Sequence, residues 1–352
     1  MLMNLLRQYL PDWLRPIARK IRRSLMPASG YAAQLKLERA NFDQQTKVHE
    51  LPEIFHYWSN TYLRPMLEEY GFSNPDQFFV QHLLEAARRS GRSEIRFLSI
   101  GAGNCDTEVR IAQALHQAGL ENFCIECLEL SPIMLARGRA DAEAHSLSQH
   151  LKFTQADFNN WNASNDYDAV MANQSLHHVS ALEHLFDAIK DSLHPKGLFL
   201  TSDMIGRNGH MRWPESLTIV QRFWQALPQS YRYNLQLRRH ESRYKNWDCS
   251  YEGFEGIRAQ DVLPELIERF NFKLFIAASS VVDIFIDRGF GYHFDVSNPR
   301  DTQFIDRIHA YDEQALASGE LTPTRLLAVM TLTPEAGQFS RGLQPAACVR
   351  RA

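Results

Sequence analysis

The sequence predicts an α/β protein built on a doubly wound, mostly parallel β-sheet. An apolar run at 97–100 ends in the glycine turn Gly101-Ala-Gly103, and the next apolar run ends in an acid, Glu129. Further apolar runs of strand length follow, and segments with helical apolar spacing lie between them. This alternation is typical of parallel strands joined by helices that cover both faces of the sheet.

The chain before the first strand is predicted to be helical. Residues 51–70 carry apolar side chains at helical spacing, which fits one amphipathic helix or a kinked pair of helices. A second helix, at 78–89, is expected to end near Gly91. Residues 30–92 therefore read as a helical cap that follows a separate basic segment, 1–29.

The segment 93–205 is predicted to form the core of the fold. The expected strands are 94–100, 124–130, 151–157, 167–173 and 197–203. The expected helices between them are 106–117, 132–144 and 181–193. Because the strands are parallel, the loops that follow them meet at one edge of the sheet, where ligands bind in open α/β folds.

After Asp203 the alternation stops. Residues 206–271 are rich in Arg, Trp, Tyr and Asn, and we expect an insertion that covers the ligand site and ends in a helix at 260–270. The segment 272–333 returns to the core with strands at 272–278 and 326–332, separated by a helical insertion near 302–317. The tail, 334–352, is expected to be irregular.

The glycine turn and the acid at the end of the second strand indicate a nucleoside-containing ligand. Glycines at 101 and 103 let a ligand approach bare backbone, where side chains would block it. The carboxylate of Glu129 can accept hydrogen bonds from both hydroxyls of a ribose.

Two further segments identify the family that the sequence resembles. The third strand ends in Asp157-Phe158, and the fourth runs into Ser175-Leu-His-His-Val179. With the glycine turn and with Glu129 followed by Ser-Pro-Ile-Met-Leu, these pieces make residues 94–205 resemble the class I S-adenosylmethionine-dependent methyltransferases. A return near 272–333 fits the same pattern.

The resemblance implies a seven-stranded sheet with an antiparallel last strand and S-adenosylmethionine as the cofactor. It implies that Gly101 and Gly103 face the methionine end of the cofactor, Glu129 the ribose, and Asp157 with the Phe158 backbone the adenine. We expect neighbouring positions to complete the cofactor site, namely Ser99, Asn104, Leu130 and Asn173. Cys105 departs from the third glycine that this family often carries.

Two other functions use the same architecture. A dinucleotide-dependent oxidoreductase needs a third glycine three residues after the second, and that position is Asp106. A non-catalytic binding module would keep the fold without the chemistry, but the intact Glu129 and Asp157 favour an enzyme.

Methyl transfer to a hydroxyl or a protonated amine requires an oriented acceptor and removal of a proton. His177 and His178 follow the fourth strand, where this fold places acceptor-lining residues, and a neutral imidazole is a suitable base. The alternative is that both histidines cap the next helix or pack beneath the loop.

The insertion is predicted to bind a small-molecule, glycan-linked or lipid-linked acceptor. Its proposed acceptor-binding residues are Arg207, His210, Arg212 and Trp213. Arginines suit a carboxylate or phosphate on the acceptor, although they also form salt bridges in packed subdomains. Tyr57, Trp58 and Tyr62 are expected either to close the cofactor site or to belong to ordinary core.

Composition excludes several classes of function. A net charge of −3 and a pI near 6.5 provide no general attraction to nucleic acid. Five cysteines do not form a disulfide pattern, and Cys124 and Cys127 point to opposite faces of a strand, so we expect no metal site there. Reduced cysteines fit a cytoplasmic protein.

The basic segment has the pattern of a helix that lies on a membrane surface. Arg15, Arg19 and Arg22 alternate with the apolar residues Ile17 and Ile21 at helical spacing. We expect residues 1–26 to contact anionic lipid weakly at the inner face of the membrane. A surface helix packed on its own domain is the alternative.

Overall fold

The computed structural model of the 352-residue chain describes residues 35, 50–163, 166–251 and 253–350. The predicted membrane-surface segment, 1–26, lies outside the described residues. Within the described part of the chain, no helix combines the length and the apolar character that crossing a bilayer requires.

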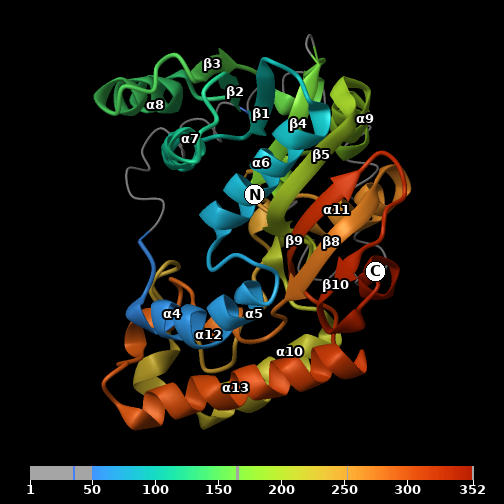
Figure 1. Cartoon of the computed structure of the whole chain (residues 1–352). Helices are drawn as coiled ribbons and strands as arrows, with labels where there is room; N and C mark the ends of the chain where they lie inside the picture. The colour runs from blue at the N-terminus through green and yellow to red at the C-terminus, as the bar shows by residue number, and fades with distance from the viewer. Residues whose placement is uncertain (1–34, 36–49, 164–165, 252, 351–352) are drawn as a thin grey trace.

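A central sheet of eight strands organises the molecule (Figure 1). The strands are β1 Ile95–Ile100, β2 Phe123–Glu129, β3 Leu151–Gln155, β4 Tyr167–Asn173, β5 Leu193–Met204, β8 Asn271–Ala278, β9 Arg325–Thr331 and β10 Gln338–Phe339. Their order across the sheet is β10-β8-β9-β5-β4-β1-β2-β3. In this sheet only β9 runs antiparallel to its neighbours, β5 and β8. This confirms the prediction of a mostly parallel sheet whose last core strand is antiparallel.

The sheet has eight strands rather than the seven that the sequence predicted. The additional strand, β10, comes from the tail that we expected to be irregular, and it pairs in parallel with the edge of β8. Phe339 packs against the apolar core on one face of the sheet, and this contact holds the short strand at the edge.

Helices cover both faces of the sheet, as a doubly wound fold requires (Figure 1). The helices α6 Pro75–Ser90, α7 Asp106–Gln117 and α8 Pro132–Ala144 pack on one face. On the other face lie α9 Leu182–Ser192 and α11 Ala259–Arg269. The central strand β4 is buried along six of its seven positions, which explains its unbroken apolar sequence.

The predicted helix at 51–70 is a kinked one. It consists of α4 Glu53–Trp58, a π-helical turn η1 Ser59–Leu63, and α5 Arg64–Glu68. Pro65 lacks the N–H group that would continue the regular hydrogen-bond ladder, and the helix widens in the turn before it.

A second layer of helices lies beneath the sheet in Figure 1 and has a core of its own. We call α4, α10 Pro214–Ala226, α12 Asp283–Ile286 and α13 Pro299–Ser318 the lid layer. A two-stranded hairpin, β6 Tyr233–Asn234 and β7 Arg239–His240, follows α10. Buried aromatic residues dominate the core of the lid layer: Trp58, Trp224, Phe285, Phe290, Phe294 and Phe304.

Short helical turns complete the chain between these elements. They are η2 Phe158–Asn160, η3 Leu176–His178, η4 Asn208–His210, η5 Gln229–Arg232, η6 Cys249–Tyr251, η7 Gly291–His293, η8 Ser340–Gly342 and η9 Pro345–Cys348. Two of them, η3 after β4 and η4 after β5, follow the carboxyl ends of adjacent parallel strands. They therefore bring their side chains to the same edge of the sheet.

Candidate active site

The loop after β1 passes so close to β4 that one of its positions must be glycine. Gly101 has φ +72°, and a Cβ built there would lie 2.4 Å from the Cβ of Ser175. Ser175 is fixed in turn, because its hydroxyl donates to the carbonyl of Ile100 at 2.7 Å. Gly103 has φ +56° but room for a side chain, so its requirement for glycine is one of backbone conformation.

Glu129 at the end of β2 is held against this loop. Its Oε2 accepts from the Gly103 N–H at 3.0 Å, and its Oε1 accepts from the Ser131 N–H at 2.9 Å. Burial raises the pKa of this carboxyl, while these hydrogen bonds act in the opposite direction. Each oxygen keeps a second lone pair, so the carboxylate has the capacity to accept two ribose hydroxyls.

Of the other predicted cofactor residues, all but Ser99 lie in the cavity wall. Asn104, Leu130, Asp157, Phe158 and Asn173 line the same cavity as the glycine loop and Glu129. The Asp157 carboxylate also caps the turn η2 by accepting from the Asn159 N–H at 3.0 Å.

Ser99 lies beneath the loop instead of in the cavity wall. Its hydroxyl donates to Glu108 Oε1 at 2.7 Å, and Glu108 lines the cavity in its place. Burial raises the pKa of Glu108 to about 7. A buried carboxyl therefore supports the loop from below.

The cavity is larger than one ligand needs. Its volume is 1420 Å³, compared with about 300–1,000 Å³ for sites that hold a single small molecule. Its lining includes the glycine loop and Glu129 together with His177, His178 and His210. A cofactor and an acceptor can therefore occupy it side by side.

Asp203 at the end of β5 fixes the turn that carries His177. Its Oδ2 accepts from the N–H groups of Ser175 and Leu176 at 2.9 and 2.7 Å. Its Oδ1 lies 2.6 Å from His177 Nδ1. Burial alone would lower the pKa of His177, but the charges and hydrogen bonds of Asp203 and Glu255 together outweigh it and raise that pKa to about 10. In this arrangement His177 is an imidazolium.

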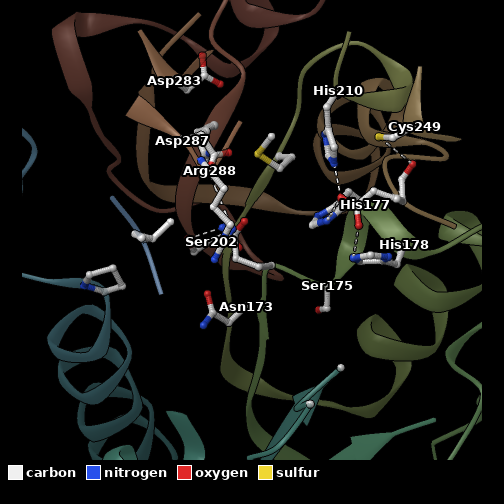
Figure 2. A pocket seen from close by; sticks show the side chains of 18 of the residues that line it. Asn173, Ser175, His177, His178, Ser202, His210, Cys249, Asp283, Asp287 and Arg288 are labelled. Atoms are coloured by element: carbon white, nitrogen blue, oxygen red, sulfur yellow. Dashed lines mark hydrogen bonds and ion pairs between the residues drawn. The ribbon is translucent and has the colours of Figure 1, made fainter. Parts of the chain in front are cut away.

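The histidines converge on one carboxylate, that of Glu255 (Figure 2). His177 Nε2 lies 3.4 Å from Glu255 Oε1, His178 Nε2 lies 3.4 Å from Oε2, and His210 Nε2 is hydrogen-bonded to Oε1. Burial would raise the pKa of Glu255, but the hydrogen bonds from His177 and His210 hold it well below its usual range. Burial lowers the pKa of His210.

Comparison with known proteins agrees with this geometry. Residues 97–197 match the family model described as a methyltransferase domain. This match confirms the resemblance of the segment to the class I S-adenosylmethionine-dependent methyltransferases. The chain's cofactor is S-adenosylmethionine, and the matched segment runs from β1 to the middle of β5. No curated protein matches the chain.

Solved structures similar to this methyltransferase are distant. A geranyl diphosphate C-methyltransferase from Streptomyces coelicolor A3(2) has 12% identity, covers 73% of this chain and 76% of its own, and gives a TM-score of 0.43. A putative sarcosine dimethylglycine methyltransferase from Galdieria sulphuraria has 12% identity, with 72% and 83% covered and a TM-score of 0.41. The [4+2]-cyclase SpnF has 14% identity, with 80% and 96% covered and a TM-score of 0.42.

The four residues predicted to bind the acceptor fall into two pairs. His210 and Arg212 line the cavity of the methyltransferase. Arg207 stacks over the ring of Trp213, its Cζ 5.5 Å from the ring centroid, and neither residue is part of the cavity wall. Trp213 is instead a buried contact between Arg207 and Arg350.

The wall opposite the histidines is charged (Figure 2). Arg212 and Asp283 form a buried ion pair, with Nη2 2.7 Å from Oδ2. Arg212 Nε and Asp283 Oδ1 have no hydrogen-bond partner among the described residues, although both side chains line the cavity. Asp287 and Arg288 extend this wall.

The aromatic residues of the N-terminal cap serve mainly as structure. The hydroxyls of Tyr57 and Tyr62 donate to Asp306 on α13, and the Trp58 indole donates to His309. Trp58 belongs to the core of the lid layer and also reaches the cavity wall. Tyr57 and Tyr62 are not part of the cavity wall, so they do not contact the predicted cofactor site.

Sequence reasoning missed Asp203, Glu255, Glu108 and Asp283. Asp203 carried a usable signal, because an acid at the carboxyl end of a parallel strand lies at the ligand edge. Glu255 carried none, because its partner His210 is 45 residues away in the sequence.

Proposed function

We propose that the chain is an enzyme that transfers the methyl group of S-adenosylmethionine to an oxygen or nitrogen of a small-molecule acceptor. One observation carries the proposal. A single cavity joins the cofactor residues Gly101, Glu129 and Asp157 to the histidines and Glu255. A non-catalytic module would have no use for acid–base residues in the wall of its cofactor cavity.

The chain's own residues would perform three tasks. The glycine loop and Glu129 would hold the cofactor with its sulfonium turned toward the acceptor. His177, His178, His210 and Glu255 would orient the acceptor, and His178 or His210 would take up its proton. Attack on the methyl carbon then forms the new bond while the carbon–sulfur bond breaks, and the electron pair remains on sulfur in S-adenosylhomocysteine.

The lid layer and the charged wall would select the acceptor. A cavity of this size suits a small molecule or the end group of a glycan-linked or lipid-linked one. The unsatisfied polar atoms of Arg212 and Asp283 suit a polar substituent on that acceptor. We place the enzyme in the cytoplasm, because its five cysteines are free thiols.

Calorimetry with S-adenosylmethionine and S-adenosylhomocysteine tests the cofactor half of the proposal. We expect micromolar binding, abolished in Gly103→Trp and weakened in Glu129→Ala, since the latter removes the acceptor of both ribose hydroxyls. Binding of NADH in place of S-adenosylmethionine would overturn the assignment.

Comparison of metabolites between a deletion strain and its parent tests the catalytic half. We expect one small molecule to lose a methyl mass in the deletion strain and to regain it with the wild-type chain but not with Gly103→Trp. A tRNA or rRNA that loses its methyl mark instead would contradict a small acceptor. Cofactor binding without any methylated product would favour the non-catalytic module.

A further inference from the structure

Three side chains in the wall of the cavity have the composition of a metal-binding set. They are His177 from η3, His210 from η4, and Glu255 from the loop after η6. One ligand atom from each lies within 4.8 Å of the other two. The sequence had indicated no metal site, because these residues meet only in the folded chain. Figure 2 shows the histidines turned toward a common point from two segments of the ribbon.

A buried carboxylate orients one of these ligands in the manner of metal sites. Asp203 Oδ1 accepts from His177 Nδ1 at 2.6 Å, and this bond fixes the proton on Nδ1 whenever the ring is neutral. The lone pair of Nε2 then points toward Glu255, whose Oε1 is 3.4 Å away. Metal-ligating histidines commonly donate their second nitrogen to a carboxylate in this way.

The spacing between His177 and Glu255 fits a first-row divalent ion. Bonds of about 2.1 Å place adjacent ligand atoms roughly 3.0–3.4 Å apart in octahedral or tetrahedral geometry. His177 Nε2 and Glu255 Oε1 are separated by 3.4 Å, which falls within this interval. The hydrogen bond between His210 and Glu255 would be exchanged for two metal bonds when an ion enters.

The charge of the cluster also favours a dication. Two carboxylates flank His177: Asp203 Oδ1 lies 2.6 Å from its Nδ1, and Glu255 Oε1 lies 3.4 Å from its Nε2. A divalent ion with two neutral histidines would balance both carboxylates.

We propose that His177 Nε2, His210 Nε2 and Glu255 bind a first-row divalent transition metal whose open coordination positions face the acceptor. Two imidazoles and one carboxylate form a set that suits zinc, iron, manganese or cobalt and leaves positions free for a substrate. Glu255 lines the cavity and keeps 44% of its side-chain surface exposed, so an ion can reach its carboxylate. This inference rests on the proposed function and narrows the acceptor to one that offers an oxygen ligand.

The metal would activate that oxygen for transfer. A hydroxyl bound to a divalent ion loses its proton to water more readily, because the ion stabilises the oxyanion. The oxyanion then attacks the methyl carbon, a carbon–oxygen bond forms, and the carbon–sulfur bond breaks with its electron pair on sulfur. The negative oxygen and the positive sulfonium both become neutral, and no oxidant or reductant takes part.

Cobalt titration of the chelator-treated full-length protein tests the site. We expect one equivalent of Co²⁺ to bind and to produce visible d–d absorption, with affinity reduced at least tenfold in His210→Ala and in Glu255→Gln. His240→Ala is the matched control, because His240 is exposed on β7 and outside the cavity wall, so its affinity should equal that of the wild type. Binding that survives both cluster substitutions would overturn the proposal.

S-adenosylhomocysteine binding by the same variants separates the two proposals. We expect it to change less than threefold, which also shows that the variants are folded. Wild-type protein that binds S-adenosylhomocysteine but no Co²⁺ would remove the metal site and leave the methyltransferase intact. If a variant fails to fold, X-ray absorption of the wild-type cobalt complex decides, since a coordination shell without imidazole would equally overturn the site.

Discussion

Gly101 is the residue at which the cofactor loop and β4 come closest. Alanine there would place its Cβ 2.4 Å from the Cβ of Ser175, which is bonded to Ile100 and to Asp203 and cannot yield without moving both neighbouring loops. We therefore expect Gly101→Ala to weaken S-adenosylhomocysteine binding at least tenfold, measured by calorimetry.

Gly119→Ala separates this clash from backbone strain. Gly119 has φ +86° and nothing within 4 Å of the added carbon, so its variant should lose roughly 1 kcal/mol of stability and no cofactor affinity. If Gly101→Ala and Gly119→Ala bound S-adenosylhomocysteine equally well, the close contact between Gly101 and Ser175 would not constrain the cofactor loop.

Glu108 makes the stability of the protein depend on pH. Its pKa rises from 4.5 to about 7 because of burial, with a minor contribution from Asp106 opposed by the Ser99 hydrogen bond and by Arg110. Between these two values the folded state binds more protons than the unfolded state, so the free energy of unfolding falls as pH rises through this interval. The full loss, on the order of 3 kcal/mol, is present above pH 7.

Glu108→Gln should therefore gain stability relative to the wild type as pH rises from 4.5 to 7. Urea unfolding at several pH values measures this difference. Glu143→Gln is the control, because Glu143 is exposed on α8 and its variant should track the wild type throughout. A difference between Glu108→Gln and the wild type that stays constant with pH would contradict the raised pKa.

At the scale of elements, one buried ion pair joins the segment before α10 to α12. Arg212 and Asp283 are each about 95% buried, so removal of one partner strands the other charge in the interior. Arg212→Met should cost about 3–5 kcal/mol in urea unfolding, and the double variant Arg212→Met/Asp283→Leu should recover most of that loss.

The exposed pair Arg64–Glu68 provides the comparison. Both of its side chains are about half exposed, and Arg64→Met should change stability by less than about 1 kcal/mol. If the double variant at 212 and 283 were no more stable than Arg212→Met alone, the stranded charge would not be the cause of the loss.

The sequence predicted the elements whose evidence is local. Each strand of the core is a short apolar run, which the sequence shows directly. Gly101, Glu129 and His177 lie at or just after the carboxyl ends of these strands. Because the strands are parallel, their position in the sequence is enough to predict that they meet at one edge of the sheet. The pairing of His210 with Glu255 depends on how the insertion folds back on itself, which no local pattern encodes. Arg207 and Trp213 show the same limit, because their residue types fit an acceptor site and their side chains pack elsewhere.

At the scale of the whole molecule, the N-terminal segment should tie the enzyme reversibly to anionic membranes. Each basic residue near such a surface contributes about 1 kcal/mol, an attraction that salt screens. Full-length protein with Arg19, Arg22 and Arg23 all changed to Glu should lose vesicle binding in flotation assays. Vesicles of zwitterionic lipid alone are the control, and wild-type binding that is equal on both lipids or insensitive to salt would contradict the prediction.

The separate aromatic core of the lid layer means that the protein should open in two steps of different free energy. Amides of α10 and α13 depend on contacts such as Trp224 with Phe290, whereas amides of β1 and β4 lie between two apolar cores that the lid layer does not share. Native-state hydrogen exchange should then show the helices exchanging through a partial opening and the central strands only through global unfolding. Such an opening would give acceptors and products a route to the cavity while the cofactor loop stays folded.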